Sequence, residues 1–176
     1  YGLGSYEVSE FLQHHHIDYL GVAYADEGVE LRKKGITTPI IVMNPEQHSY
    51  QTIIEYNLEP EIYSFRVLEL FYEAVQKSGY DKKYPIHIKL ETGMHRLGFK
   101  DFELDQLSEI LSQKNLKVQS MFSHLSSSDM PEEKEFTLKQ LEVFEKSSSY
   151  LTEKLGYGPI RHILNSSGIT SYTDHQ

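Results

Sequence analysis

Charged and polar side chains gather in residues 89–99, whose sequence is KLETGMHRLGF and which follow a short apolar run. The two glycines let the backbone turn tightly, and Lys89 and Arg96 stand seven residues apart. A guanidinium in such a loop is suited to holding a phenolate, a carboxylate or a phosphate through paired hydrogen bonds. The loop pattern leaves a second interpretation open, in which Lys89 is a solvated lysine at a strand end and Arg96 pairs with a nearby acid.

Two further segments carry groups that could do chemistry. Residues 123–129 (SHLSSSD) place His124 just past an apolar run, where an imidazole can stack on a planar ligand, bind a metal or exchange a proton. Residues 162–168 (HILNSSG) bring Asn165 and Ser166 to an expected helix start, where hydroxyls and free backbone N–H groups suit a phosphate dianion. A structural histidine and an ordinary N-cap turn are the respective alternatives.

Other candidate sites are weaker. Adjacent side chains at a helix end diverge, so His14-His15-His16 predicts a surface cluster and not a metal site. The sequence contains no His-Glu-x-x-His, no Walker loop and no G-x-G-x-x-G motif. The acidic residues Glu132, Glu133 and Glu135 fall where a helix N-terminus favours negative charge, so they require no further role.

Composition narrows the class of protein. The chain has 176 residues and a formal net charge of -9, with 39% apolar residues, which indicates a globular protein without a basic surface for nucleic acid or anionic membrane. No apolar stretch approaches the roughly 20 residues of a membrane-spanning helix. The absence of cysteine excludes disulfides, thiolate-bound zinc and a thiol nucleophile. We therefore expect a cytoplasmic protein.

The elements expected to position these segments alternate between short apolar strands and amphipathic helices. Strands are predicted at 17–23, 40–43, about 61–63, 86–90, 118–122 and 160–164, and helices at about 6–13, 26–35, 46–56, 64–79, 103–112 and 131–156. Asp26 and Ser64 are expected to begin two of these helices as N-caps, and Gly35, Gly79 and Gly156 are expected to end three of them.

Strands separated by helices imply right-handed βαβ units and a parallel sheet. The sheet could be open and doubly wound, or it could belong to a (β/α)8 TIM barrel, which needs eight strands in about 250 residues. We expect the second: a TIM barrel truncated at both ends to about six parallel strands with flanking helices, forming one partial domain over residues 1–176. In either architecture, function gathers at the carboxyl ends of the strands, where segments 89–99, 123–129 and 162–168 begin.

Taken together and in order, these segments resemble the alanine racemases, fold-type III enzymes that use pyridoxal 5'-phosphate (PLP). Residues 92–99 (TGMHRLGF) are similar to the family's T-G-M-x-R-L-G motif. Further similarities lie in Ser123-His124-Leu125 with Asp129, in His162-x-x-Asn165-Ser166, in Tyr1-Gly2-Leu3-Gly4, and in Gly21-Val22-Ala23 with Glu27, Leu31-Arg32 and Gly35. The resemblance covers essentially the whole chain. Glu91, where the family usually has aspartate, and the serine run 126–128 are mild departures.

The resemblance implies a role for each matching residue. Tyr1 and Ser166 would bind the cofactor phosphate, Arg96 would donate to its phenolic oxygen, His124 would pack against the pyridine ring, and Asn165 would help to line the pocket. Two supporting residues complete the set. Lys89 falls where many members carry a carbamylated lysine that orients the arginine, and His162 would orient a second arginine that faces the pyridine nitrogen.

The resemblance also places essential groups outside the chain. The Schiff-base lysine would lie four residues before Tyr1, and the second catalytic base, a tyrosine, would come from the C-terminal domain of the partner subunit. Racemisation needs a base on each face of the α-carbon as well as the cofactor. We therefore expect a piece of a homodimeric enzyme that interconverts L- and D-alanine for peptidoglycan synthesis, with no catalytic residue of its own and inactive when alone.

Two alternatives remain. A single-domain barrel of this fold type could bind PLP as a carrier or homeostasis protein without turnover. The chain could also be a racemase-like domain fused to a larger polypeptide.

Overall fold

The computed structural model describes residues 4–175 and contains six strands in one sheet. The strand order is β1-β2-β3-β4-β5-β6, so each strand lies beside the strand that follows it along the chain. An open doubly wound sheet would reverse its strand order at a switch point, whereas a barrel keeps the order sequential. The register pairs of β1 with β2, β2 with β3, and β5 with β6 are parallel. The predicted fold, a TIM barrel truncated to six parallel strands with flanking helices, is confirmed.

The described strands span three to seven residues and the α-helices six to 22. The strands are β1 (Leu20–Val22), β2 (Ile40–Val42), β3 (Glu59–Ile62), β4 (Tyr84–Lys89), β5 (Leu116–Phe122) and β6 (Ile160–His162). The α-helices are α1 (Ser5–His14), α2 (Ala25–Lys33), α3 (Tyr50–Glu55), α4 (Phe65–Ser78), α5 (Leu104–Ser112), α6 (Lys134–Leu155) and α7 (Ser166–Ser171). Short 3-10 turns precede α3, α5 and α6 and follow α7.

The chain forms two compact units, of which the first comprises Tyr1–Glu61 and Glu69–Pro85. Its core contains an aromatic cluster in which Tyr50 and Tyr84 both meet Phe71 edge-on. The buried Tyr84 hydroxyl donates to the backbone oxygens of Ile53 (3.1 Å) and Leu58 (2.8 Å), and burial raises the pKa of this phenol. These two bonds join the end of α3 to the strand that carries Tyr84, so the polar hydroxyl inside the core is satisfied.

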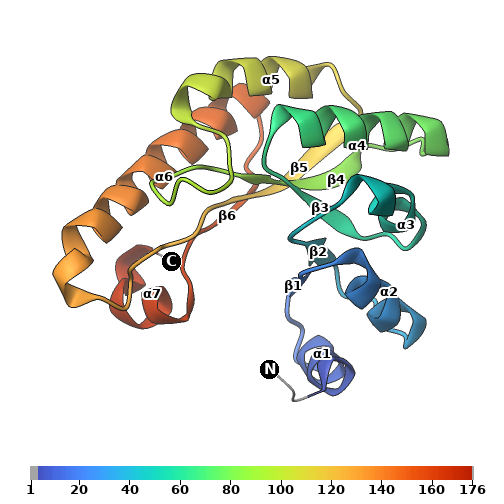
Figure 1. The fold of residues 1–176 in the computed structure, drawn as a ribbon, viewed down its shortest axis with the longest axis horizontal. Helices are drawn as coiled ribbons and strands as arrows, with labels where there is room; N and C mark the ends of the chain where they lie inside the picture. Colours follow the sequence, from blue (N-terminus) through green and yellow to red (C-terminus); the bar gives the residue numbers. More distant parts are fainter. Residues whose placement is uncertain (1–3, 176) are drawn as a thin grey trace. The chain divides into compact units, whose positions relative to one another are not determined.

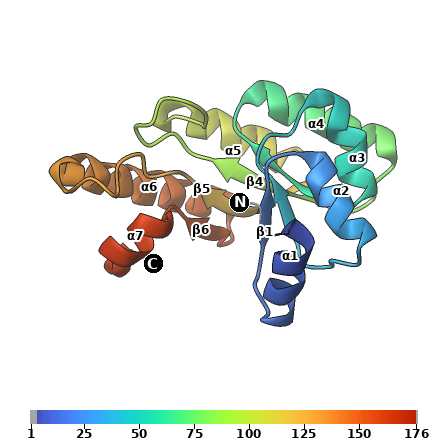
Figure 2. The same ribbon diagram turned by 60° about the horizontal axis from the view of Figure 1, so that its bottom comes forward.

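The second unit comprises Ile62–Leu68 and Ile86–Gln176, and it contains the candidate segments 89–99, 123–129 and 162–168. Helices α5 and α6 pack side by side, and α7 follows directly after β6 (Figures 1 and 2). Along β4 and the residue that follows it, Ile86, Ile88 and Leu90 alternate with His87 and Lys89, and all five are buried. Successive side chains of a strand point to opposite faces, so the apolar set and the polar set of β4 occupy different faces of the sheet.

The structure corrects two details of the sequence prediction. Asp26 does not begin α2, because the N-cap position belongs to Tyr24 and Asp26 lies within the first turn. The Glu27 carboxylate reaches back instead and accepts hydrogen bonds from the backbone N–H groups of Ala23 (2.7 Å) and Tyr24 (3.2 Å). Two predicted helices are divided: the one at 46–56 into a 3-10 turn over Gln47–Ser49 and the shorter α3, and the one at 131–156 into a 3-10 turn over Pro131–Glu133 and α6.

The remaining predicted helix ends are confirmed. The Ser64 hydroxyl accepts a hydrogen bond from the N–H of Val67, as expected of an N-cap. Gly35, Gly79 and Gly156 each adopt a positive φ where their helices end.

Candidate functional site

The loop that carries Arg96 is closed at its base by backbone hydrogen bonds. Phe99 N donates to Lys89 O and Glu91 N donates to Phe99 O, both at 2.9 Å, so the ends of the loop are tied together. The Glu91 carboxylate accepts a hydrogen bond from Gly93 N and lies 3.8 Å from Nδ1 of His95. Glu91 therefore braces the loop from within.

Lys89, at the end of β4, is only 6% exposed, and its Nζ lies 4.8 Å from the centre of the Phe122 ring on β5. The interpretation of Lys89 as a solvated strand-end lysine is therefore wrong. Arg96 is exposed, and within residues 4–175 no acid forms an ion pair with it. The acid-paired interpretation of Arg96 finds no support in that range. The loop therefore presents one embedded ammonium and one guanidinium that is open to a ligand.

His124 lies close to both cations. Its pKa is lowered from the ordinary value, first because the ring loses water and then because Lys89 and Arg96 carry positive charge nearby. The lowered pKa favours the neutral form of the His124 imidazole. His124 is exposed and lies just past the carboxyl end of β5. The structure thus brings together three of the residues singled out by sequence: Lys89, Arg96 and His124.

A line of polar side chains crosses β4, β5 and β6. The Ser120 hydroxyl lies 2.7 Å from Nδ1 of His87 and 3.1 Å from Nε2 of His162, and the His162 ring stacks on Phe122 at a centroid distance of 5.0 Å. Because the serine has a single hydroxyl hydrogen, it can donate to one imidazole while it accepts from the other. His162 is therefore oriented by its neighbours on β5, and its proposed action on an arginine stays a prediction.

We expect His162 to make the chain less stable in acid. His162 as a whole residue is exposed, but its ring stacks on Phe122 and loses water there. This loss chiefly lowers its pKa to about 4, with smaller contributions from His87 and Lys89. The unfolded chain binds this proton near the ordinary value of 6.5. The unfolded state therefore gains the extra proton first, and the free energy of unfolding should fall as pH drops from about 6.5 to 4.

Urea unfolding of the wild type and of His162→Gln across this pH interval measures the effect. The variant should lose less stability than the wild type between the two pH values. Parallel pH dependences in the two proteins would contradict the prediction.

Asn165 is the N-cap of α7, so the ordinary interpretation of this turn is confirmed. Its Oδ1 accepts from Gly168 N (2.9 Å) and from the Ser128 hydroxyl (2.7 Å), while its Nδ2 donates to Leu125 O (3.2 Å). Asn165 therefore connects the loop after β5 to the start of α7. Ser166, the first residue of that helix, is exposed. Tyr1 lies outside the described residues.

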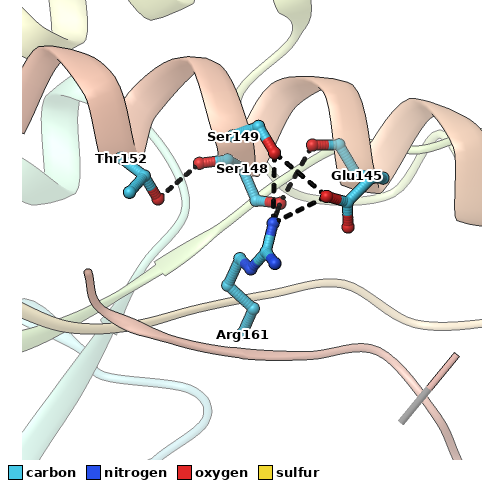
Figure 3. A network of polar contacts seen from close by, with 5 residues as sticks. All are labelled: Glu145, Ser148, Ser149, Thr152 and Arg161. Atoms are coloured by element: carbon cyan, nitrogen blue, oxygen red, sulfur yellow. Dashed lines mark hydrogen bonds and ion pairs between the residues drawn. The ribbon is translucent and has the colours of Figure 1, made fainter.

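The outward face of β6 is held to α6 by Arg161. As Figure 3 shows, the Arg161 guanidinium donates to Glu145 Oε1 (2.9 Å) and to the Ser149 hydroxyl (3.1 Å). This hydrogen bond from Arg161 is the main reason that the pKa of Glu145 is lowered. All three side chains are largely exposed, so the network orients the strand more than it stabilises the fold.

The sequence did not single out Gln140, His87 or Ser120. Gln140 is a fully buried glutamine on α6 that contacts two of the predicted segments. For His87 and Ser120 a usable signal existed, since polar residues that alternate with apolar ones in a buried strand mark a second, polar face. The helical pattern offered no such signal for Gln140, which stands beside the core residue Leu141.

Within residues 4–175, no helix combines the length and apolar character needed to cross a membrane, and no group of three or more His, Asp or Glu residues is arranged to hold a metal ion.

Comparison with known proteins extends this picture. The family model described as alanine racemase, N-terminal domain, matches residues 1–176. The alanine racemase of Thermodesulfovibrio yellowstonii is 36% identical over 169 residues, which are 96% of this chain and 44% of that protein. An amino-acid racemase of Enterococcus faecalis is 38% identical over 149 residues, which are 83% of this chain and 20% of that protein.

A solved structure of alanine racemase from Clostridium difficile 630 superimposes with a TM-score of 0.88 at 29% identity, covering 96% of this chain and 46% of that one. The chain thus spans less than half of the length of these relatives. The family model matches residues 1–176, and the strand order is sequential, as in a barrel. The chain therefore belongs to the alanine racemase N-terminal domain family.

Proposed function

We propose that this chain supplies the cofactor-binding part of a PLP-dependent racemase that interconverts L- and D-alanine. The observation that carries the proposal is the cluster of Lys89, Arg96 and His124 at the ends of β4 and β5, where cations surround a neutral ring. When bound, PLP supplies an electron sink for negative charge at the α-carbon of an amino acid.

The residues present suit the parts of this cofactor. The Arg96 guanidinium, which forms no ion pair within residues 4–175, would donate to the phenolic oxygen. The exposed His124 ring would pack against the pyridine. The Ser166 hydroxyl, together with Tyr1, would bind the phosphate. Lys89 would help to orient Arg96, and carbamylation would place a negative charge on the Lys89 side chain. Asn165 would fix the segment that carries Ser166.

The wider setting is also a proposal. Residues 1–176 would form one partial barrel domain of a cytoplasmic homodimer that makes D-alanine for peptidoglycan. The names of the relatives support alanine as the substrate, while the amino-acid racemase of Enterococcus faecalis supports a test of other small amino acids.

Replacing Arg96 with alanine is expected to weaken PLP binding by about 10- to 100-fold, because a hydrogen bond from a charged donor is lost. Equilibrium dialysis with PLP, carried out on the whole gene product, measures the change in affinity. The matched control is Arg66→Ala, which removes an exposed arginine from the first turn of α4 and should leave the affinity unchanged.

Production of D-alanine from L-alanine, followed by chiral chromatography, tests the reaction itself. A wild-type protein that binds no PLP would overturn the proposal. A protein that binds PLP but racemises no amino acid would be a carrier of the cofactor. Faster turnover of serine than of alanine would identify serine, and not alanine, as the preferred substrate.

A further inference from the structure

Gln140 is a completely buried polar residue in the second turn of α6, and both its amide nitrogen and its amide oxygen form hydrogen bonds. Its Nε2 donates to the Thr92 hydroxyl (3.2 Å) and to the backbone oxygen of His124 (3.1 Å). Its Oε1 accepts from the backbone N–H of Ser126 (3.0 Å). A buried amide with two donated bonds and one accepted bond avoids the desolvation penalty of an unpaired polar group.

These three bonds reach two different loops. Thr92 begins the turn that leads to Arg96, and its hydroxyl lies 2.8 Å from that of Ser123, at the start of the other loop. His124 and Ser126 belong to that other loop, so Gln140 grips it on both sides of Leu125. One side chain on a rigid helix thus sets the separation of the loop that presents Arg96 and the loop that presents His124.

The close approach of α6 depends on Gly93. A Cβ atom at this residue would lie 3.1 Å from the Phe136 ring and 3.5 Å from the Gln140 side chain. The φ of Gly93 is +131°, a value that other residues rarely adopt. The glycine next to Thr92 therefore leaves room for the helix to bring the Gln140 amide to the loop.

The loop gripped by Gln140 is in turn bonded to the start of α7. Ser128 donates to Asn165 Oδ1 (2.7 Å), and the Ser167 hydroxyl donates to the Ser128 oxygen (2.9 Å). The placement of segment 162–168 therefore depends on segment 123–129, which is bonded to Gln140.

We propose that Gln140 is a positioning residue for cofactor binding, which holds the Arg96 loop and the His124 loop at the spacing that one PLP molecule requires. This inference rests on the proposed function. An amide is needed because the site demands two donors and one acceptor together, and no carboxylate or apolar side chain provides that set. Binding groups on loops depend on such support, because loops alone hold their side chains loosely.

Gln140→Met tests the proposal, since it keeps the length and approximate volume of the side chain and removes all three hydrogen bonds. Gln106→Met, at an exposed position on α5, is the matched control. In the protein as encoded, and well below the unfolding temperature of each variant, PLP affinity should fall about tenfold for Gln140→Met and less than twofold for Gln106→Met.

Two further measurements separate positioning from general stability. In the Arg96→Ala background, Gln140→Met should weaken PLP binding much less than tenfold, because one of the two groups whose spacing Gln140 sets is absent. Hydrogen exchange at the Ser126 amide should accelerate in Gln140→Met, while exchange at core amides of β5 stays slow. If Gln140→Met does not fold, Thr92→Val removes one of the three Gln140 bonds together with the Thr92–Ser123 contact and should weaken PLP binding about threefold. Ser123→Ala, which removes the Thr92–Ser123 contact alone, should have a smaller effect and is the control for it.

The outcomes distinguish the two proposals. A wild-type protein that binds no PLP overturns the proposed function, whereas wild-type affinity in folded Gln140→Met, or in Thr92→Val when that is the variant used, overturns the positioning role alone. Equal effects of Gln140→Met with and without Arg96 also overturn it.

Discussion

Replacement of Gly98 with alanine is expected to destabilise the fold by about 3 kcal/mol or more, because two separate penalties fall on one residue. The φ of Gly98 is +124°, which strains any residue with a Cβ atom. The added Cβ would lie 2.7 Å from both Glu91 N and the carbonyl carbon of Leu90. These are backbone atoms, so no change of rotamer can relieve the overlap, and the ends of the Arg96 loop must separate.

The matched control for this variant is Gly156→Ala at the end of α6. Gly156 also has a positive φ, +74°, but a Cβ there would meet nothing within 4 Å. It should lose only the conformational penalty, about 1 kcal/mol. Urea unfolding followed by circular dichroism gives both values, and equal losses in the two variants would show that the backbone contact at Gly98 does not matter. PLP affinity should fall only in Gly98→Ala.

Replacement of Arg32 with methionine is expected to lower the free energy of unfolding by about 3 kcal/mol. The guanidinium donates to four backbone oxygens: Ile36 (2.8 Å), Thr38 (2.8 Å), Tyr56 (3.2 Å) and Asn57 (3.1 Å). It therefore joins the segment after α2 to the segment after α3. Burial lowers the pKa of the guanidinium, which nevertheless stays protonated at neutral pH.

Arg32→Lys distinguishes the shape of the side chain from its charge. A lysine keeps the charge but cannot donate along four fixed directions, so this variant should lose about 1–2 kcal/mol. Arg66→Met, at an exposed position of α4, provides the control and should stay within about 0.5 kcal/mol of the wild type. Urea unfolding midpoints, compared at equal denaturant slopes, give the stability of all three variants. Wild-type stability in Arg32→Lys would show that the planar guanidinium is not needed.

Most of the strand and helix pattern was predictable from the sequence, because local rules govern it. The run Ile40–Val42 is apolar and flanked by turn residues, and Ser64 caps its helix as expected. One error came where a neighbouring side chain replaced the expected cap. Glu27 took the role assigned to Asp26, since its longer chain reaches two backbone N–H groups at once.

The sequence by itself determined the family, the order of the loaded loops and the residue types that they present, because these depend on motifs whose members lie close together along the chain. Only the tertiary structure decided that Lys89 is buried against Phe122 and that Asn165 accepts a hydrogen bond from Ser128, 37 residues before it. It also showed that Gln140 forms hydrogen bonds to two loops, one of them through Thr92, which lies 48 residues away in the sequence. Such contacts have no local pattern, since they exist only after strands and helices have packed and brought distant polar groups to where they can satisfy one another.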